Sequence, residues 1–417
     1  MSPADTRSGP RIALLDSGLS RLMGHHSHFG QGLAQLCARE GVSLTTFSAK
    51  SVEAKLAPRL GGPVAVFARS LYQPLGNGDI YDRDWNDFRT GRQLYAADLD
   101  QSGLEMQASD LIWIPTARPR EIAGLAEWLL KRERDHRPRV ALGFHRLLRP
   151  LAPGSAEGLT HRLATDRLAE AVGRDRIFPY ATNHRLAQRL AGAMNLGIYL
   201  APLPHFYGAL ASPASPPALP PGDGPLLVIF GDPDARKNGV PLAGIVREAL
   251  RQRPDLRFVI QVRAEADPGL LELEKLRPLK LVEGWLEEDA FVALIRAADL
   301  LLLPYRRERY ADTISGPFAF AAAHERPAIV PAGTWMAERI ARKQAAGVAY
   351  KRDAALIDAL MLAADRMTKL KAQAAALAPR WRVWDAEALF RLVRQWSLGQ
   401  GTGKLRRVDP KPPPGPR

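Results

Sequence analysis

The sequence predicts an α/β fold built from two doubly wound domains, each a parallel sheet with helices on both faces. Two observations support this prediction. Short apolar stretches alternate with helical periodicity along most of the chain, which is typical of parallel sheets. A proline-rich stretch divides that alternation into two runs near the middle of the 417 residues. A chain of this length exceeds the size at which one hydrophobic core stops growing, so two domains are expected.

The elements of the first run follow from the pattern of apolar residues. The stretch RIALL (residues 11–15) is a short apolar strand, and periodicity predicts a helix over 28–39 that ends at Gly41. Further strands are expected at VSLTTFS (42–48), LIWIPT (111–116), RVALGFH (139–145), IFPY (177–180) and NLGIYL (195–200), with a helix over 121–135. Residues 61–104 are interpreted as an excursion over the sheet edge, where YDRDWNDFR (81–89) gathers aromatic and charged side chains.

Composition changes sharply after the first run, because eight prolines fall between residues 201 and 225. Proline fixes φ and lacks an N–H, so this stretch can be neither a helix nor a central strand and is interpreted as a linker. Alternation then restarts, with strands expected at LLVIF (226–230), LRFVIQV (256–262), LKLVEG (279–284), DLLLLP (299–304) and AIVP (328–331), helices between them and an alanine-rich helix over 354–378.

Composition also excludes several classes of protein. The single cysteine, Cys37, excludes an internal disulfide framework and a cysteine-based zinc cluster. No apolar run approaches the roughly 18 residues that a membrane-spanning helix needs. The first ten residues lack the pattern of a signal peptide. The sequence therefore predicts a cytoplasmic protein.

The formal net charge of +14 is the strongest compositional signal. It suits nucleic acid, an anionic membrane face or anionic small molecules, or it reflects a GC-rich genome that favours arginine. No helix-turn-helix, zinc-finger or RNP-like pattern accompanies the charge, so we expect no nucleic-acid partner. Peripheral contact with an anionic membrane stays open.

Two loops that follow strands of the second run suit an anionic ligand. In GDPDARKNG (231–239), Gly231 ends a strand, and the adjacent cations Arg236 and Lys237 suit a diphosphate. In the turn Thr313–Gly316, Ser315 is a good helix cap and Gly316 begins the helix, whose backbone N–H groups form an anion site. A solvated basic loop and an ordinary capped helix are the alternatives.

Histidines follow two strands of the first run. His145 ends the strand at 139–145 and either points into the ligand cleft or is a satisfied core residue. The stretch GHHSHF (24–29) supplies His25, His26 and His28, but no carboxylate or cysteine accompanies them at metal-ligand spacing. We therefore expect no metal site, and we expect Gly24 to let this loop approach a ligand.

The second run resembles the donor domain of GT-B glycosyltransferases, in the family 4-like branch (glycosyltransferase group 1). The resemblance covers about residues 225–350 and rests on GDPDARKNG (231–239), LKLVEGWLEEDAFVALIRAADLLLLPY (279–305) and SGPFAFAAAHERPAIV (315–330). In the first run it rests on strand order, GHHSHFGQGL (24–33) and GFH (143–145). It implies two Rossmann-like domains that face each other across a cleft, a nucleotide-diphosphate sugar as co-substrate, and no metal or other cofactor.

The resemblance also implies roles for individual residues. The implied donor diphosphate site is Gly231, Arg236, Lys237, Thr313, Ser315 and Gly316. The implied catalytic residues are His145, which lines the sugar, and Asp312, which orients it. Gly24, His25 and His26 lie on the sugar and acceptor side.

The chain departs from the family pattern beside the Ser-Gly turn. The family places two glutamates eight residues apart there, and this chain has Asp312 and Phe320 at those positions. Glu325 stands where the family has a glycine. We therefore expect altered ribose recognition, and whether Phe320 abolishes activity stays open.

Five segments are expected: an N-terminal acceptor-side domain (1–205), a proline-rich linker (206–224), a donor domain (225–380), a helix that crosses back to the N-terminal domain (381–400) and a disordered basic tail (401–417). The implied activity is a retaining, metal-independent transfer of a sugar to a glycan or lipid-linked acceptor, in cell-surface polysaccharide biosynthesis at the inner membrane face. A nucleotide-sugar 2-epimerase on the same scaffold and a non-catalytic GT-B-like binding protein stay open.

Overall fold

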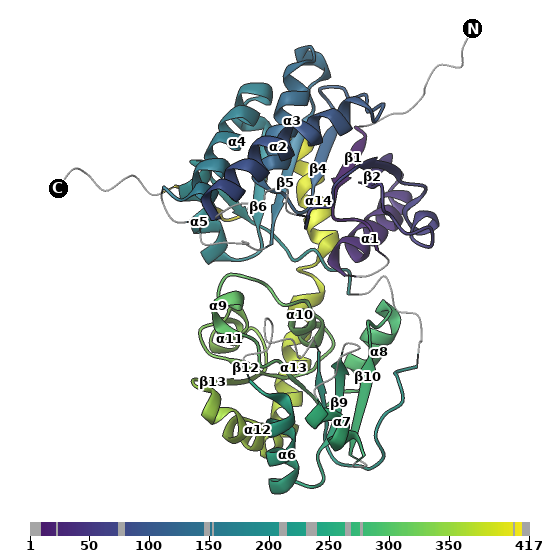
Figure 1. Ribbon diagram of the computed structural model, residues 1–417, viewed down its shortest axis with the longest axis vertical. Helices are drawn as coiled ribbons and strands as arrows, with labels where there is room; N and C mark the ends of the chain where they lie inside the picture. The colour runs from purple at the N-terminus through teal and green to yellow at the C-terminus, as the bar shows by residue number, and fades with distance from the viewer. Residues whose placement is uncertain are drawn as a thin grey trace, which may run out of the picture. The chain divides into compact units, whose positions relative to one another are not determined.

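The computed structural model describes residues 10–21, 24–73, 80–145, 151, 154–207, 215–230, 240–262, 268–275, 278–402 and 405–410. The chain divides into two compact units (Figure 1). Met1–Pro204 and Ala386–Arg417 form the N-terminal unit, and His205–Asp385 form the C-terminal unit. Each unit contains a sheet of mainly parallel strands flanked by helices, which confirms the predicted α/β fold.

The N-terminal unit contains an eight-stranded sheet in the order β14-β7-β6-β5-β4-β1-β2-β3. Its strands are β1 (Ile12–Asp16), β2 (Leu44–Ala49), β3 (Val64–Phe67), β4 (Leu111–Ile114), β5 (Arg139–Phe144), β6 (Ile177–Ala181), β7 (Ile198–Leu200) and β14 (Arg407–Val408). Its helices are α1 (His25–Arg39), α2 (Ile80–Asp100), α3 (Pro119–Leu130), α4 (Ala156–Val172), α5 (His184–Met194) and α14 (Ala386–Ser397). Neighbouring strands pair in parallel except β14 and β7.

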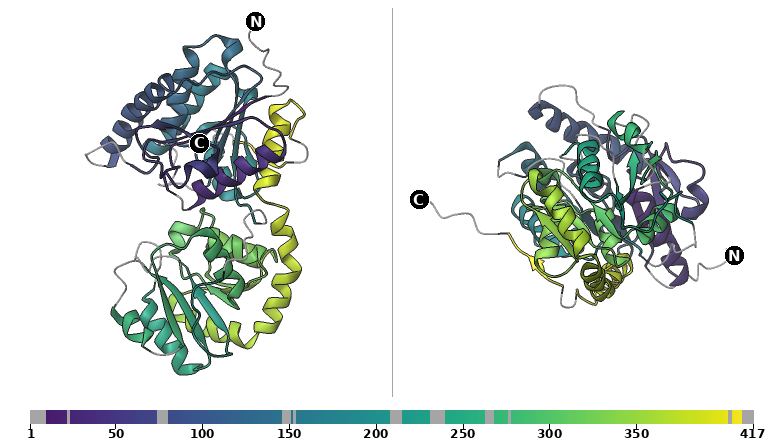
Figure 2. Two further views of the ribbon diagram at one scale, coloured as in Figure 1. Left: turned by 90° about the vertical axis from the view of Figure 1, so that its right-hand side faces the viewer. Right: turned by 90° about the horizontal axis from the view of Figure 1, so that it is seen from below.

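Helices cover both faces of this sheet. The helices α2, α3 and α4 pack side by side on one face, and α1 and α14 lie together on the other (Figures 1 and 2). Because both faces are covered, β1, β4 and β6 bury every side chain. Trp128 of α3 is fully buried in one layer, and Trp113 of β4 meets Phe29 of α1 edge-on in the other, with ring centroids 5.4 Å apart.

The C-terminal unit contains a six-stranded parallel sheet in the order β10-β9-β8-β11-β12-β13. Its strands are β8 (Leu226–Ile229), β9 (Arg257–Val262), β10 (Leu279–Glu283), β11 (Leu300–Leu302), β12 (Ala328–Pro331) and β13 (Gly347–Tyr350). Its helices are α6 (Leu242–Gln252), α7 (Pro268–Glu274), α8 (Glu288–Ala297), α9 (Arg307–Tyr310), α10 (Gly316–Ala323), α11 (Trp335–Ala341), α12 (Leu356–Asp365) and α13 (Met367–Arg382). The single alanine-rich helix expected over 354–378 is two helices, α12 and α13, separated at Arg366.

The stretch over 61–104 is not the excursion that we expected, because it forms β3 and the 21-residue helix α2. The aromatic ring of Phe67 on β3 stacks on Tyr95 of α2 at 4.8 Å, which fixes the second half of the helix on the sheet. The first half of α2 carries YDRDWNDFR, whose few apolar residues leave helical periodicity too weak to detect.

Helix α1 begins at His25, three residues before the expected start at His28. Gly24 precedes it with φ of 86°, a left-handed conformation that favours glycine. The first turn buries His26, Ser27 and His28 instead of apolar side chains. Periodicity based on apolar residues therefore misses this turn.

The end of the chain returns to the N-terminal unit, and part of the tail expected to be disordered is a strand. Helix α14 packs beside α1, and Trp396 meets Phe178 of β6 at 5.2 Å. Residues 407 and 408 form β14, antiparallel to β7. Val408 is buried there, and the Arg407 guanidinium lies 5.8 Å from the centre of the Tyr199 ring. A β-branched valine and an arginine that stacks on a tyrosine both suit a strand at the edge of the sheet. The basic composition of the tail does not reveal this strand.

Candidate functional site

A hydrogen-bonded chain of three side chains lies at the carboxyl end of β1, with Asp16 and His26 buried and Tyr72 exposed. Asp16 ends the strand, and its Oδ2 lies 2.8 Å from Nδ1 of His26 in the first turn of α1. The other ring nitrogen, Nε2, lies 2.7 Å from the hydroxyl of Tyr72. A carboxylate oxygen accepts a hydrogen bond from Nδ1–H, and in that tautomer of the neutral imidazole Nε2 accepts from the Tyr72 hydroxyl. The arrangement fixes the tautomer of His26 and uses both of its nitrogens.

The backbone at Gly18 makes room for this chain. The Gly18 N–H donates to Oδ1 of Asp16 at 2.9 Å, which holds the carboxylate facing the ring. A Cβ atom at position 18 would lie only 2.3 Å from Cε1 of His26. Any larger residue would therefore displace the imidazole.

His145 and His25 lie next to the chain. The ring of His25 lies over that of His26 at 3.9 Å and meets His145 edge-on at 6.5 Å. The pKa of His145 is lowered to about 4, chiefly by burial. Nearby His26 also lowers this pKa, whereas the Pro115 carbonyl and Asp16 raise it. His145 is therefore neutral at pH 7. Sequence analysis expected Gly24, His25, His26 and His145 at one site, and the structure brings the three histidines together.

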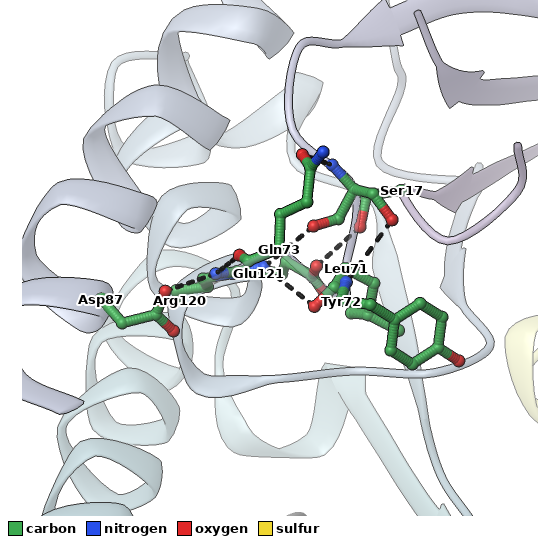
Figure 3. Close-up of polar contacts among 8 residues, drawn as sticks. Ser17, Leu71, Tyr72, Gln73, Asp87, Arg120 and Glu121 are labelled. Atoms are coloured by element: carbon green, nitrogen blue, oxygen red, sulfur yellow. Dashed lines mark hydrogen bonds and ion pairs between the residues drawn. The ribbon is translucent and has the colours of Figure 1, made fainter. Parts of the chain in front are cut away.

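A second polar network begins at Ser17, the residue after Asp16, and was not found from the sequence (Figure 3). Ser17 donates a hydrogen bond of 2.7 Å to Oε1 of the buried Glu121. Burial raises the pKa of Glu121, although Arg120 and Ser17 partly offset the effect. The guanidinium of Arg120 donates to the carbonyls of Ser70, Leu71 and Gln73 and to Asp87. These bonds fix the loop that carries Tyr72.

The same loop borders a cavity of about 320 Å³. Its lining comes from four segments of the N-terminal unit: Tyr72, then Arg83, Asp84, Asp87 and Phe88 of α2, then Arg118, Pro119 and Arg120 at the start of α3, and Glu157 and Thr160 of α4. The stretch YDRDWNDFR thus supplies one wall of a cavity. Sequence analysis noted only that this stretch gathers aromatic and charged side chains.

In the C-terminal unit, the turn before α10 has the expected cap. Oγ of the buried Ser315 accepts a hydrogen bond of 3.3 Å from Phe318 N–H. Pro317 has no N–H, so Gly316 carries the amide that remains at the helix start. A Cβ atom at Gly316 would meet only the His205 ring, at 3.8 Å, among the described residues. Asp312 and Thr313 precede the cap and are half-buried.

Phe320 belongs to an aromatic cluster of the C-terminal unit. It is buried, with ring centroids 5.4 Å from His205, 5.2 Å from Tyr207 and 5.4 Å from Phe291. The side chain at the family's second glutamate position therefore fills an apolar space. Gly231, Arg236 and Lys237, the expected diphosphate residues, lie outside the described residues.

No group of three or more His, Cys, Asp and Glu side chains within the described ranges could hold a metal ion. Over the same ranges, no helix is both long and apolar enough to cross a membrane.

Comparisons with known proteins show the fold. Neither a family model nor a curated protein matches this chain. The glycotransferase of kitacinnamycin has a TM-score of 0.61 at 14% identity, covering 93% of this chain and 99% of that one. A protein provisionally assigned as a UDP-N-acetylglucosamine 2-epimerase from Listeria monocytogenes has a TM-score of 0.58 at 12% identity, covering 95% and 98%. An E. coli structure described as trehalose-6-phosphate bound with UDP-2-fluoro glucose has a TM-score of 0.54 at 13% identity, covering 92% and 99%.

Proposed function

Because this chain has the GT-B fold, we propose that it is a glycosyltransferase that moves a sugar from a nucleotide-diphosphate sugar to a glycan or lipid-linked acceptor. The proposed transfer retains the configuration of the sugar and needs no metal. It takes place in the cytoplasm and serves cell-surface polysaccharide biosynthesis. The family 4-like branch is the proposed relation within the fold.

One observation carries the proposal. The likeness to the kitacinnamycin glycotransferase covers 93% of this chain and 99% of that one, so counterparts of both units of such an enzyme are present. The likeness to the structure bound with UDP-2-fluoro glucose has a similar extent and supports a nucleotide sugar as donor. Fold alone does not assign function, so the residues of each unit must support the same chemistry.

On the donor side, we assign binding of the diphosphate to Gly231, Arg236 and Lys237 and to the start of α10. Arg236 and Lys237 neutralise the charge that develops as the glycosidic bond breaks, and Gly231 lets the loop approach. Gly316 N–H and the dipole of α10 add to this stabilisation, with Ser315 and Thr313 beside them.

The sugar and acceptor are assigned to polar residues of both units. Asp312 orients the sugar, while His145, neutral at pH 7 because burial lowers its pKa to about 4, lines the sugar as a hydrogen-bonding group without charge. Both nitrogens of His26 are engaged, so we assign His26 a positioning role that acts through the Tyr72 hydroxyl. His25, which is half-buried, remains the histidine of this stretch that can contact an acceptor.

Nucleotide release tests the proposal directly. Wild-type protein is incubated with UDP-, GDP- and ADP-sugars, with and without a lipid or glycan extract, and free nucleotide is measured. We expect acceptor-dependent release that the double substitution Arg236→Ala, Lys237→Ala abolishes. Arg251→Ala is the matched control, since this exposed arginine pairs with Glu248 on α6. Release that is the same in the double variant would contradict the assignment.

A nucleotide-sugar 2-epimerase is the second candidate, because one structure with this fold carries that provisional assignment. An epimerase would release free nucleotide and a C2-inverted sugar from the donor alone. Proton NMR of the sugar product separates the two candidates. A non-catalytic binding protein is the third, and it would keep its cellular role in the Arg236→Ala, Lys237→Ala variant.

Contact with an anionic membrane is proposed for the basic surface. Some arginines serve the fold, because the guanidinium of Arg137 donates to three backbone carbonyls and that of Arg176 to two. The net charge of +14 would attract anionic lipid headgroups. Flotation with anionic vesicles at low and high salt measures this contact, and its absence in low salt would contradict it.

A further inference from the structure

A hydrogen bond links the wall of the cavity beside Tyr72 to the cluster of His25, His26 and His145. The Tyr72 side chain lines the cavity, and its hydroxyl lies 2.7 Å from Nε2 of His26. Four hydrogen bonds from the buried Arg120 hold the backbone at residues 70–73 and the side chain of Asp87, so this wall of the cavity is cross-linked. A ligand in the cavity would therefore lie beside the residues that we assign to the acceptor side.

The charges that line the cavity balance. Three arginines and three carboxylates contribute, which are Arg83, Arg118 and Arg120 with Asp84, Asp87 and Glu157. Arg120 pairs with Asp87, and the other two arginines equal the other two carboxylates in number. A site for a phosphate or carboxylate would need an excess of positive charge. Balanced donors and acceptors suit a neutral ligand with many hydroxyl groups, since each hydroxyl both donates and accepts.

Arg83 is the side chain in this lining that lacks a partner. It makes no ion pair or hydrogen bond within the described part of the chain, and its Nε is buried. A buried N–H without an acceptor is destabilising, so a ligand hydroxyl that reaches this guanidinium gains a hydrogen bond. The aromatic rings of Tyr72 and Phe88 add apolar wall, which suits the C–H groups of a sugar ring.

We infer that this cavity is an acceptor subsite that binds a neutral hexopyranose unit through Arg83, the carboxylates beside it and the rings of Tyr72 and Phe88. The acceptor role rests on the proposed function, whereas sugar binding in the cavity does not. A volume of about 320 Å³ is at the lower end for ligand pockets, in keeping with one sugar ring.

Saturation-transfer difference NMR on the full chain tests the inference. The probes are methyl glycosides of glucose, mannose and galactose, with glucuronic acid and glucose 6-phosphate as charged comparisons. We expect at least one neutral glycoside to give a signal, and we expect Arg83→Gln to reduce its affinity about tenfold. Arg89→Gln is the matched control, because Arg89 is exposed on the same helix and bonds to Asn86. We expect this control to bind like the wild type.

Three results would overturn the inference: no signal from any neutral glycoside, stronger binding of the charged sugars, or a signal unchanged in Arg83→Gln. If Arg83→Gln unfolds, Asp84→Asn at the same wall replaces it, with the same expected loss. Nucleotide-sugar binding is measured separately by thermal shift. Donor binding without glycoside binding would refute only the subsite, and glycoside binding without donor binding would refute only the transferase.

Discussion

Asp16 and His26 form a buried pair at the carboxyl end of β1, with 2.8 Å between Oδ2 and Nδ1. The two residues are ten positions apart, and the turn at Gly18 folds one back onto the other. The pair orients Nε2 towards Tyr72, whose hydroxyl is at the border of the cavity. The side chains that we propose for the acceptor side are thus positioned by the buried carboxylate of Asp16.

Replacing Asp16 by Asn should lower kcat by about a hundredfold with little change in KM, the size of effect that a small misplacement of an active-site group causes. An amide can donate as well as accept, so it no longer fixes the tautomer of His26. Steady-state kinetics measures the split between kcat and KM. Asp110→Asn is the control, because Asp110 is equally buried but pairs with Arg11. An equal loss of kcat in the control would assign the effect to stability instead.

Gly18→Ala should destabilise the protein by about 1–3 kcal/mol and reduce activity, as overpacking of a core does. The added methyl would lie 2.3 Å from the His26 ring and force it away from Asp16. Denaturant unfolding measures the stability change. Gly192→Ala serves as control, because an added Cβ meets nothing within 4 Å on α5 and replaces a helical glycine. Equal stability of the Gly18→Ala variant and wild type would contradict the close approach.

Stability should fall as the pH is lowered from about 6.5 towards 4. Burial lowers the pKa of both His145 and His161 to about 4 in the folded chain. Between these values the unfolded chain binds more protons, so stability rises with pH by up to about 1.4 kcal/mol per pH unit for each histidine. Denaturant unfolding between pH 4.5 and 7.5 measures the slope. The slope should decrease in His161→Gln and persist in His136→Gln, where an exposed histidine is changed.

Phe320→Glu should not restore a family-like carboxylate site. The side chain packs among His205, Tyr207 and Phe291, and an unpaired buried charge costs about 3–5 kcal/mol. Phe320→Leu, which keeps the site apolar, should be less destabilised. Thermal unfolding of both variants measures the two losses of stability. A Phe320→Glu protein that is as stable as wild type and more active would show that the position faces a ligand.

Much of the fold could be predicted because buried parallel strands are continuous apolar stretches, as LIWIPT and LLVIF are. Helix α2 could not, since its contact with the sheet depends on Tyr95 meeting Phe67, a partner on another element. The same holds for the site. His145 could be placed because it directly follows a strand, whereas the Tyr72–His26 contact joins residues 46 positions apart.

The residues that support the site were missed for a related reason. Ser17 and Glu121 are 104 positions apart in the sequence, and neither belongs to a motif. A buried glutamate at the start of α3 looks like an ordinary acidic first-turn residue, which stabilises a helix dipole. Only the hydrogen bond between Ser17 and Glu121 in the folded chain reveals that this glutamate holds the residue after Asp16.

Nucleotide-sugar binding tests the central claim most directly. UDP-, GDP- and ADP-sugars are added to wild-type protein and to the Arg236→Ala, Lys237→Ala variant, and the melting temperature is measured. We predict that one donor class raises the melting temperature of the wild type by several degrees and leaves that of the double variant unchanged, since a ligand that binds only the folded state stabilises it. No shift with any nucleotide sugar would contradict the transferase and the epimerase alike.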